Sequence, residues 1–450
     1  ETTMEAMLSS ISGSGSASTF LPSGKKLSLC VLPDEVSRQN HPLSIHKLSS
    51  LVGSACHQNT AVHVGGVTHS APVAAAVARS FPLYDRKTTG KEDDNSDKEP
   101  PTVSVTCFDS DDKELTVDRA AEEAVAEGVR LASRLGDTTP EELTTDAFAE
   151  ECQMIADRFE SVTMTQIVGE ELREKGYGGL FGVGKGAECP PRLIILDYTP
   201  PSSSSPSQTV ALVGKGIVYD TGGLALKSKT GMCGMKSDMC GAAGMLGALL
   251  AAALLKVDCK IQVLLCVAEN AIGPKAFRND DILTMYSGKT VEINNSDAEG
   301  RLVLGDGVAH ASKHLEGCDL IVDMATLTGA QMVATGQKHA GILANSAELE
   351  QRTIQAGMIS GDLTFPLVYA PELLKDEFKS KVADMKNSVK DRTNAQASCA
   401  GHFIESHLDK DYKGGWLHVD MAGPSFIDQR ATGYGVGLVL ALLGAPGFRP

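Results

Sequence analysis

The chain has 450 residues, of which 42% are apolar and 22% are charged, and its formal net charge is −16. This length exceeds one ordinary hydrophobic core, so a globular, water-soluble chain of two or three domains is expected. The negative charge argues against a nucleic acid or an anionic membrane as a partner, and it suits a cationic ligand such as a metal ion or a protonated amine.

The first part of the chain carries few regular patterns. Residues 9–18 are rich in Ser and Gly and are predicted to be flexible. Strands are predicted at 27–32 and 102–108, and a helix at 71–79, where a proline is tolerated in the first turn. The first residues lack the apolar core of a signal peptide, while a targeting segment removed before Glu1 stays an open alternative.

A charged loop at 86–101, which ends in two prolines, precedes a long predicted helix at 118–135 with apolar residues at helical spacing. We expect this helix to join two domains. The smaller N-terminal α/β domain would comprise residues 1–116 and the connecting helix residues 117–136. The larger C-terminal domain, which would carry the activity, would comprise residues 137–450.

Beyond this helix, predicted strands and helices alternate. The predicted strands are 193–196, 209–213, 262–267, 320–324 and 416–420. The predicted helices are 145–159, 241–255 and 305–315. The Ser- and Pro-rich stretch 199–207 is expected to be an exposed loop. This alternation favours an α/β/α sandwich around a mixed, mostly parallel central sheet.

Two features bear on the location of the protein. The longest apolar run, 242–255, is too short to span a bilayer and is predicted to be a buried helix, so no membrane association is expected. The 11 cysteines are scattered without a Cys-x-x-Cys pair, which disfavours a zinc ribbon and predicts free thiols in a reducing compartment. A cytoplasmic protein is therefore expected.

One region concentrates charged residues among glycines. Lys215 and Asp220 follow a predicted strand, and ligands of open α/β sheets gather at the carboxyl ends of strands. Four glycines between positions 214 and 223 allow the backbone to bend and to approach a ligand closely. Asp297 and Glu299 would point to one side of an extended loop, which suits a pair of oxygen ligands. Four carboxylates gathered in one site would repel one another, and two divalent cations would cancel that repulsion.

Other interpretations of these residues stay open from spacing alone. The acidic side chains could lie apart on loops, where they would cap helices. A P-loop is disfavoured, because Gly216 follows Lys215 where Ser or Thr would be required, and Lys185 has the same defect. A two-metal phosphoesterase usually adds histidine ligands, and none of the 11 histidines lies between Lys215 and Arg301.

Taken in order, these motifs resemble the leucyl aminopeptidase family. The run 214–223, followed by Lys227 and Asp238, and the stretch 295–301 match the family signature, with Ser296 in place of the usual threonine. Shorter matches lie at 137–140, 323–330 and 418–423. The resemblance covers roughly residues 118–443, and the stretch 382–388 is similar to the branch described as probable aminopeptidase-like proteins.

The resemblance implies two divalent metal ions that share carboxylates. The tighter ion would be held by Lys215, Asp220, Asp238 and Glu299. The more exchangeable ion would be held by Asp220, Asp297 and Glu299, together with the Asp297 carbonyl. Lys215 would act as a neutral amine, because two adjacent dications disfavour its ammonium form. Zn²⁺ or Mn²⁺ is expected, with Mg²⁺ and Co²⁺ as alternatives, because availability often decides which metal fills such a site.

The resemblance also implies a reaction, the release of the N-terminal residue from peptides with a free N-terminus. A hydroxide bridging the two metals would attack the first peptide carbonyl. Lys227 would stabilise the resulting gem-diolate, and Arg301 would hold a bicarbonate ion that acts as the general base. The C-terminal domain would then be a catalytic metalloaminopeptidase domain.

Substrate contacts are implied for further residues. Backbone groups around Thr326, Leu327 and Gly329 are expected to orient the substrate. Met235 and Ala422 are expected to border the side-chain pocket. The residues that follow Ala422 differ from the bulkier apolar residues of relatives, so a preference for leucine is not implied.

Family members are typically homohexamers, and a homohexamer is therefore expected. The alternative function is a catalytically reduced scaffold or regulatory binding member of the same family, of which some relatives bind DNA. The net charge of −16 and the complete set of implied metal ligands count against this alternative.

Overall fold

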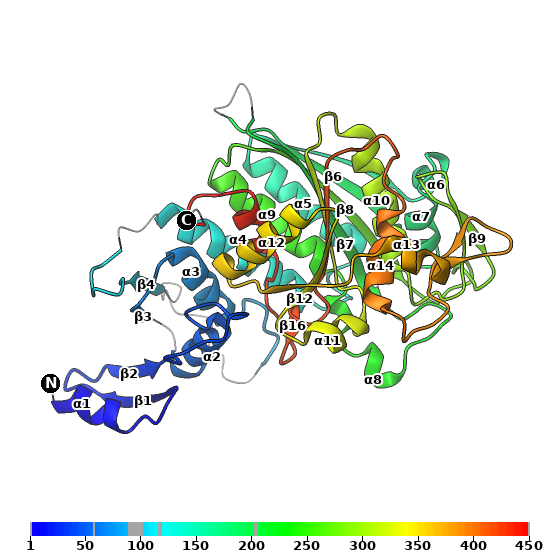
Figure 1. Cartoon of the computed structure of the whole chain (residues 1–450). Coiled ribbons are helices and arrows are strands. Elements are labelled where there is room, and N and C mark those ends of the chain that lie inside the picture. Colours follow the sequence, from blue (N-terminus) through cyan, green and yellow to red (C-terminus); the bar gives the residue numbers. More distant parts are fainter. Residues whose placement is uncertain (1, 57–58, 89–101, 116–118, 202–205, 449–450) are drawn as a thin grey trace.

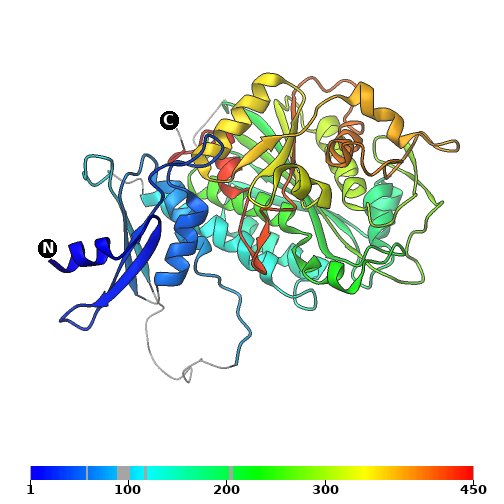
Figure 2. The same cartoon turned by 60° about the horizontal axis from the view of Figure 1, so that its bottom comes forward.

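The computed structural model describes residues 2–56, 59–88, 102–115, 119–201 and 206–448. A smaller N-terminal part, blue in Figure 1, lies beside a larger part built around one long sheet. Figure 2 shows the same two parts from below, with the C-terminal end of the chain close to the seam between them. The predicted boundary near residue 116 falls outside the described residues, so the division into domains stays a prediction.

In its described residues, the N-terminal part contains two small sheets and three helices. Its elements are α1 (Thr2–Ser9), β1 (Gly15–Phe20), β2 (Lys26–Val31), α2 (Ile45–Ala55), β3 (Thr60–Val64), α3 (Ser70–Arg79) and β4 (Val103–Cys107). Strands β1 and β2 form an antiparallel hairpin, and β3 pairs with β4 in parallel. The predicted flexibility of 9–18 is therefore wrong from Gly15 onward, because β2 supplies a hydrogen-bonding partner that composition alone did not reveal.

Helix α4 (Arg119–Asp137) confirms the long helix predicted at 118–135, whose first residue lies outside the described residues. Its buried face includes Ala124, Val125 and Val129, which belong to the largest hydrophobic core together with Ala71 and Ala75 of α3. The helix thus packs against α3 of the N-terminal part within one continuous apolar core.

The central sheet has eight strands in the order β13-β12-β15-β11-β7-β8-β6-β5. They are β5 (Val162–Val168), β6 (Arg192–Tyr198), β7 (Thr209–Asp220), β8 (Lys260–Asn270), β11 (Leu320–Ala325), β12 (Ala340–Ala344), β13 (Thr364–Pro366) and β15 (Gly415–Asp420). Strands β15, β11, β7 and β8 are mutually parallel. Strand β12 runs antiparallel to β15, and β13 is parallel to β12. On the other side, β6 runs antiparallel to β8. The sheet is thus mixed and mostly parallel, as expected.

Helices cover both faces of this sheet. One face packs on α4 together with α5 (Thr145–Arg158), α9 (Cys240–Leu254), α12 (Ala347–Ser360) and α15 (Val436–Leu442). The other face packs on α7 (Gly178–Gly184), α10 (Gly300–His314) and α14 (Gln396–Glu405). Alternate residues of β7 serve the two cores: Val210 and Leu212 face the first, and Ala211 and Val213 face the second. The α/β/α arrangement predicted from the sequence follows from this alternation.

Shorter elements connect these layers. They are α6 (Glu170–Glu174), α8 (Lys229–Met232), the 3-10 helix η1 (Met235–Ser237), α11 (Gly329–Thr335), α13 (Pro371–Leu374), the 3-10 helix η2 (Lys375–Phe378), a small sheet of β14 (Met385–Lys386), β10 (Thr290–Glu292) and β9 (Ile282–Thr284), and a hairpin of β16 (Phe426–Ile427) and β17 (Arg430–Ala431). Among the described residues, one helical stretch, Lys229–Leu254, is long and apolar enough to cross a membrane, and 94% of its most apolar window is buried inside the fold. Helix α9 within it is therefore a core helix, as predicted for 242–255.

Candidate active site

The carboxyl ends of the parallel strands carry the predicted polar residues. Lys215 and Asp220 lie on β7, and Asp220 stands opposite Asn270 at the end of β8. The backbone then turns sharply at Gly222 and Gly223, whose φ angles are +83° and +60°. A Cβ atom on Gly222 would lie 2.6 Å from the carbonyl oxygen of Ala225, so this turn requires glycine.

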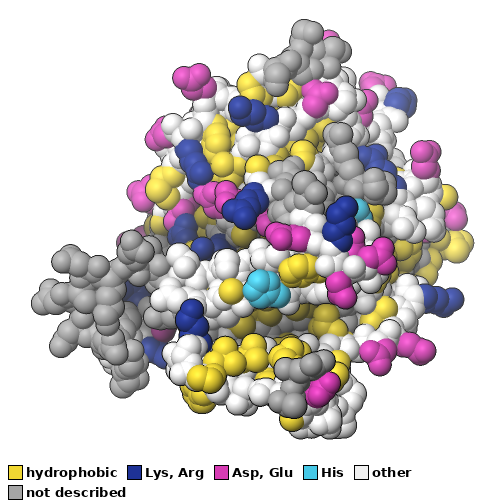
Figure 3. Space-filling model, turned by 90° about the vertical axis from the view of Figure 1, so that its left-hand side faces the viewer, with side chains coloured by type: hydrophobic (Ala, Val, Ile, Leu, Met, Phe, Trp, Pro, Cys, Tyr) yellow, Lys and Arg dark blue, Asp and Glu magenta, His cyan; other side chains and the backbone are white. Residues whose placement is uncertain are grey.

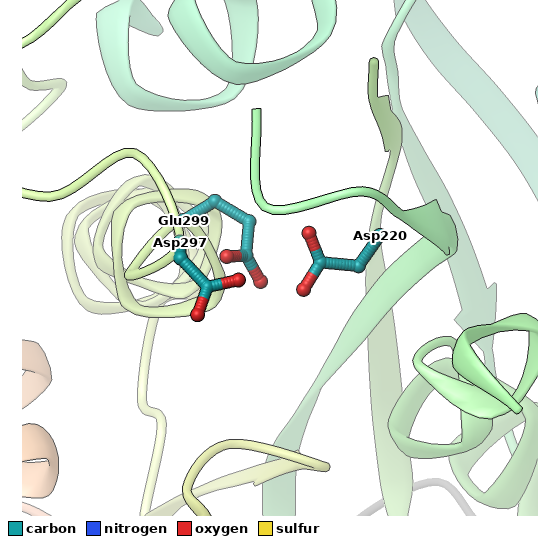
Figure 4. Close-up of side chains that lie close together, drawn as sticks. All are labelled: Asp220, Asp297 and Glu299. Carbon is teal, nitrogen blue, oxygen red and sulfur yellow. The ribbon is translucent and has the colours of Figure 1, made fainter. Parts of the chain in front are cut away.

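Three carboxylates converge at this edge of the sheet. One oxygen from each of Asp220, Asp297 and Glu299 lies within 4.8 Å of the others. Figure 4 shows the three carboxyl groups pointing toward a common centre, Asp220 from the end of β7 and the other two from the chain entering α10. Asp220 and Glu299 are buried, and Asp297 is partly exposed. The structure thus brings these three predicted side chains together at one edge of the sheet.

Lys215 lies between two of the acids. Its Nζ atom is 2.9 Å from Asp238 Oδ1 and 2.9 Å from Glu299 Oε1, and it donates to the Thr326 carbonyl oxygen at 3.0 Å. Burial by itself lowers the pKa of Lys215, but the carboxylates of Asp238, Glu299 and Asp220 outweigh burial and hold the pKa above its ordinary value. Without ions, Lys215 is therefore an ammonium group paired with its acidic neighbours.

Lys227 pairs with the other two acids. Its Nζ atom lies 2.8 Å from Asp220 Oδ2 and 2.5 Å from Asp297 Oδ1. Burial raises the pKa of the Asp297 carboxyl, and Lys227 opposes that rise. The four carboxylates and two ammonium groups of this cluster leave a formal charge of −2, so the site favours additional cations.

Arg301 lies in the first turn of α10. Its Nη1 atom donates to the Asn387 carbonyl oxygen at 3.0 Å, and its Nε atom is buried without a hydrogen-bond partner among the described residues. Burial lowers the pKa of Arg301 to about 10, and Glu299 opposes that fall. The side chain therefore remains a cation at neutral pH and has an N–H group left for an anion.

Of the predicted substrate-contacting residues, Thr326 contacts the acidic cluster directly. The Thr326 hydroxyl donates to Asp238 Oδ1 at 2.8 Å. Leu327 and Ala422 are brought together by Asp420, whose Oδ1 atom accepts their backbone N–H groups at 3.1 Å and 3.3 Å. Met235 opens η1, three residues before Asp238. Gly329 is exposed at the start of α11, on the other side of Thr328.

Several supporting residues were not predicted. Asn270 donates to Asp220 Oδ1 at 2.8 Å and to the Ser296 carbonyl oxygen at 3.1 Å, which links β8 to the loop before α10. Asp420 is fully buried and also accepts the Thr328 hydroxyl at 2.7 Å. The placement of Asn270 at the carboxyl end of a strand was the one sequence signal that could have identified it.

A second buried network lies behind Asp420. Asp323 on β11 accepts Nδ1 of His418 at 2.5 Å and Nε1 of Trp416 at 2.9 Å, and all three side chains are fully buried. Burial by itself lowers the pKa of His418, but Asp323 outweighs burial and raises it. This network ties β11 to β15 directly beneath the loops that border the site.

A mixed α/β sheet whose parallel strands end in a buried cluster of carboxylates and lysines fits the class of metal-dependent hydrolases. The family described as "cytosol aminopeptidase family, catalytic domain" matches residues 130–440. The chain belongs to this family and is a leucyl-type metalloaminopeptidase, an exopeptidase that acts on peptides. The resemblance seen in the sequence is thereby confirmed.

Individual relatives agree with this assignment. The chain is 49% identical over 423 residues to the mouse "Probable aminopeptidase NPEPL1", covering 92% of this chain and 79% of the relative. It is 40% identical over 422 residues to "Leucine aminopeptidase 1" of Caenorhabditis elegans, covering 92% and 83%. The leucyl aminopeptidase of Leishmania major, solved in complex with actinonin, superposes with a TM-score of 0.91 at 40% identity, covering 98% of this chain and 87% of that one. The similarity to the probable aminopeptidase-like branch is thus confirmed.

Proposed function

We propose that this aminopeptidase uses two divalent cations held between β7, η1 and the start of α10. The tighter cation would be held by Lys215, Asp220, Asp238 and Glu299. The exchangeable cation would be held by Asp220, Asp297 and Glu299, with the Asp297 carbonyl. The observation that carries the proposal is the convergence of four carboxylates against two ammonium groups in one largely buried cluster.

The residues present fit such cations. The Asp238 Oδ2 and Glu299 Oε2 atoms are buried and have no hydrogen-bond partner among the described residues. A buried, unpaired carboxylate oxygen is costly, and a cation would remove that cost. All the donors except the Lys215 amine are oxygen atoms, which suits Zn²⁺, Mn²⁺, Mg²⁺ or Co²⁺. When bound, the cations would supply Lewis acidity and lower the pKa of a water molecule toward neutrality.

The remaining polar groups would act on the substrate. With Asp220 and Asp297 engaged by cations, the Lys227 ammonium would be free to donate to the oxyanion that develops on the scissile carbonyl. The guanidinium of Arg301, with its unpaired Nε, would hold a bicarbonate ion as general base. The free α-amine of the substrate would be recognised in the same acidic cluster, which explains a restriction to N-termini.

The loops around the cluster would orient the peptide. Backbone groups of Thr326, Leu327 and Gly329 would bind the substrate main chain, and Met235 and Ala422 would border the pocket for its first side chain. Ser425, by contrast, is 1% exposed and its backbone N–H donates to the Met421 carbonyl oxygen at 3.1 Å, so it would act on this pocket through the backbone rather than by contact.

The test is hydrolysis of a panel of aminoacyl-coumarin substrates by metal-stripped protein reloaded separately with Zn²⁺, Mn²⁺, Mg²⁺ or Co²⁺. An N-acetylated substrate is the control. We expect cleavage that requires both a metal and the free amine. Silence with every metal would overturn the catalytic proposal and favour a scaffold that retains the metal site.

We further propose a homohexamer. Large apolar side chains are exposed on α11 and around α13, where Val333 is 90% and Leu373 73% exposed. Exposed apolar groups on short surface helices suit contacts between copies of the chain. Light scattering should give six times 47.3 kDa, and Val333→Asp should lower the mass, while the control Met154→Asp, at a 57% exposed side chain on α5 against the other face of the sheet, should not. A monomeric wild-type protein would refute the hexamer.

A cytoplasmic location without nucleic-acid or membrane partners completes the proposal. It is supported by the names of relatives such as the "Probable cytosol aminopeptidase" of Leifsonia xyli and by the free thiols of all 11 cysteines. On the face shown in Figure 3, acidic and basic side chains are interspersed among the described residues rather than gathered into a basic patch.

A further inference from the structure

Residues 79–86, here called the tether, link the N-terminal part of the chain to segments that lie beside the active site. Arg79 Nε donates to the Thr432 carbonyl oxygen at 2.8 Å, and Arg430 Nη2 donates to the Tyr84 carbonyl oxygen at 2.9 Å. Tyr84 Oη also donates to Glu142 Oε1 at 3.0 Å. The tether therefore contacts both the β16–β17 hairpin and the loop after α4.

Lys236 connects the tether to the metal-binding turn. It lies in η1, between Met235 and Asp238, and its Nζ atom donates to the Asp137 carbonyl oxygen at the end of α4. The same Nζ atom lies 5.8 Å from the centroid of the Tyr84 ring, within the range of a cation–π interaction. The Lys236 side chain thus contacts both helix α4 and the tether.

Helix η1, which contains Lys236, has little stability of its own. Helix η1 is a single turn of three residues that is preceded by Gly234, whose φ is +93°. One isolated turn has little intrinsic stability, because its hydrogen bonds do not offset the entropy of ordering it. The end of α4 is closely packed by contrast, since a Cβ on Gly136 would lie 2.7 Å from both the Ala431 Cβ and the Cys240 Sγ.

We infer that Lys236 is a positioning residue, through which the tether and α4 hold η1 so that Asp238 and Met235 face the active site. This inference rests on the proposed role of Asp238 as a metal ligand. Lys236 itself is not among the proposed metal ligands, and its Nζ atom donates to the Asp137 carbonyl oxygen. The contacts of Lys236 reduce the number of backbone conformations open to Asp238 before a cation binds, and so lower the entropy cost of binding.

The test compares Lys236→Met, Lys236→Arg and Tyr84→Ala with the wild type. Hydrogen–deuterium exchange of residues 232–240 is measured in metal-free protein, and Mn²⁺ and Zn²⁺ binding is measured by equilibrium dialysis. KM and kcat are measured at saturating metal. The matched control is Lys313→Met, because Lys313 also donates to a carbonyl oxygen, that of Tyr286, at 2.6 Å and lies 4.8 Å from the Tyr286 ring centroid.

In Lys236→Met we expect faster exchange across 232–240. Metal binding should weaken by about tenfold, because one charge-assisted hydrogen bond is lost. At saturating metal we expect a raised KM and a kcat within about twofold of the wild type. Lys236→Arg should restore most of the affinity, and Tyr84→Ala should show a smaller loss of the same kind. Unchanged exchange and affinity in Lys236→Met, or equal effects in Lys313→Met, would overturn the inference. A wild type that binds metal without peptidase activity would refute only the proposed function.

Discussion

Replacing Asp420 by Ala should damage the substrate side of the site. Its Oδ1 atom accepts the backbone N–H groups of Leu327, Ala422 and Thr328 at 3.1, 3.3 and 3.4 Å, and its Oδ2 atom accepts the Thr328 hydroxyl at 2.7 Å. The substitution leaves these donors without a partner in a buried region. Because each unsatisfied buried donor costs about 1–3 kcal/mol and the loops relax in part, we expect the free energy of unfolding to fall by about 3–5 kcal/mol.

The consequence for activity follows from the same contacts. The 326–328 loop would lose its fixed backbone course, and with it the groups proposed to orient the peptide. A displacement of reacting groups by about 1 Å can cost about 100-fold, so we expect kcat/KM to fall by at least that factor. Urea unfolding, kcat/KM with an aminoacyl-coumarin and metal content by mass spectrometry are the three measurements. Metal content should stay near the wild-type value, because Asp420 contacts none of the proposed ligands directly.

Two further variants make the test sharp. Asp420→Asn keeps one acceptor oxygen for the amides and should lose less of both stability and activity. Asp319→Ala is the matched control, since the Asp319 carboxylate also accepts a backbone N–H, that of Thr209 at 2.8 Å, but is exposed at the opposite end of the sheet. Turnover of Asp420→Ala within twofold of the wild type, or an equal loss in Asp319→Ala, would show that Asp420 does not position the substrate loops.

Three other substitutions test separate parts of the site and the fold. Lys227→Ala should keep both metals and lower kcat by about 10²–10³-fold, as for the loss of one oxyanion donor, while the exposed neighbour variant Lys229→Ala should be normal by the same steady-state assay and metal analysis. Asp297→Ala should bind fewer metal equivalents and lose activity while keeping its circular dichroism spectrum, because this side chain is 31% exposed; full stoichiometry would remove it from the ligand set. Burial raises the pKa of Asp306 from 3.8 to about 7, so the folded protein retains a proton that the unfolded chain releases, and the contribution of this group to stability is lost as pH rises through that interval. Asp306→Asn should therefore flatten the decline of the melting temperature between pH 4 and pH 7, and an unchanged slope would contradict the assignment.

Much of the catalytic fold could be predicted because its strands are short apolar runs between turn-forming residues. The strand predicted at 209–213 continues as β7 to Asp220, and the prediction stopped short because Gly214, Lys215 and Gly216 interrupt the apolar run. Helix α10 likewise begins at Gly300 rather than at 305. The prediction missed this first turn because the functional residues that open the helix interrupt the apolar periodicity.

Elements without a strong pattern were missed. Strand β5 (Val162–Val168) is the outer strand of the sheet and has an irregular burial pattern, so its alternation is weak. Helices α12 and α14 have mixed composition, and they are helical because one side of each packs on the sheet core. Tertiary burial decides such segments, and it is not visible in a local sequence window.

The site shows the same division between chemistry and support. Charged residues at strand ends can be recognised in the sequence, whereas the position of Asp238 depends also on backbone packing that the sequence does not reveal. Asp238 precedes α9 by two residues, and α9 approaches its neighbours closely: a Cβ on Gly241 would lie 2.2 Å from the Met324 carbonyl oxygen, and one on Gly247 would lie 2.5 Å from the Gly128 carbonyl oxygen. Glycines that allow a core helix to press against β11 and α4 therefore fix where a proposed metal ligand stands. Because these residues have no side chain, no chemical motif reveals their part in the site, and the aminopeptidase signature describes the reacting groups without the packing that holds them.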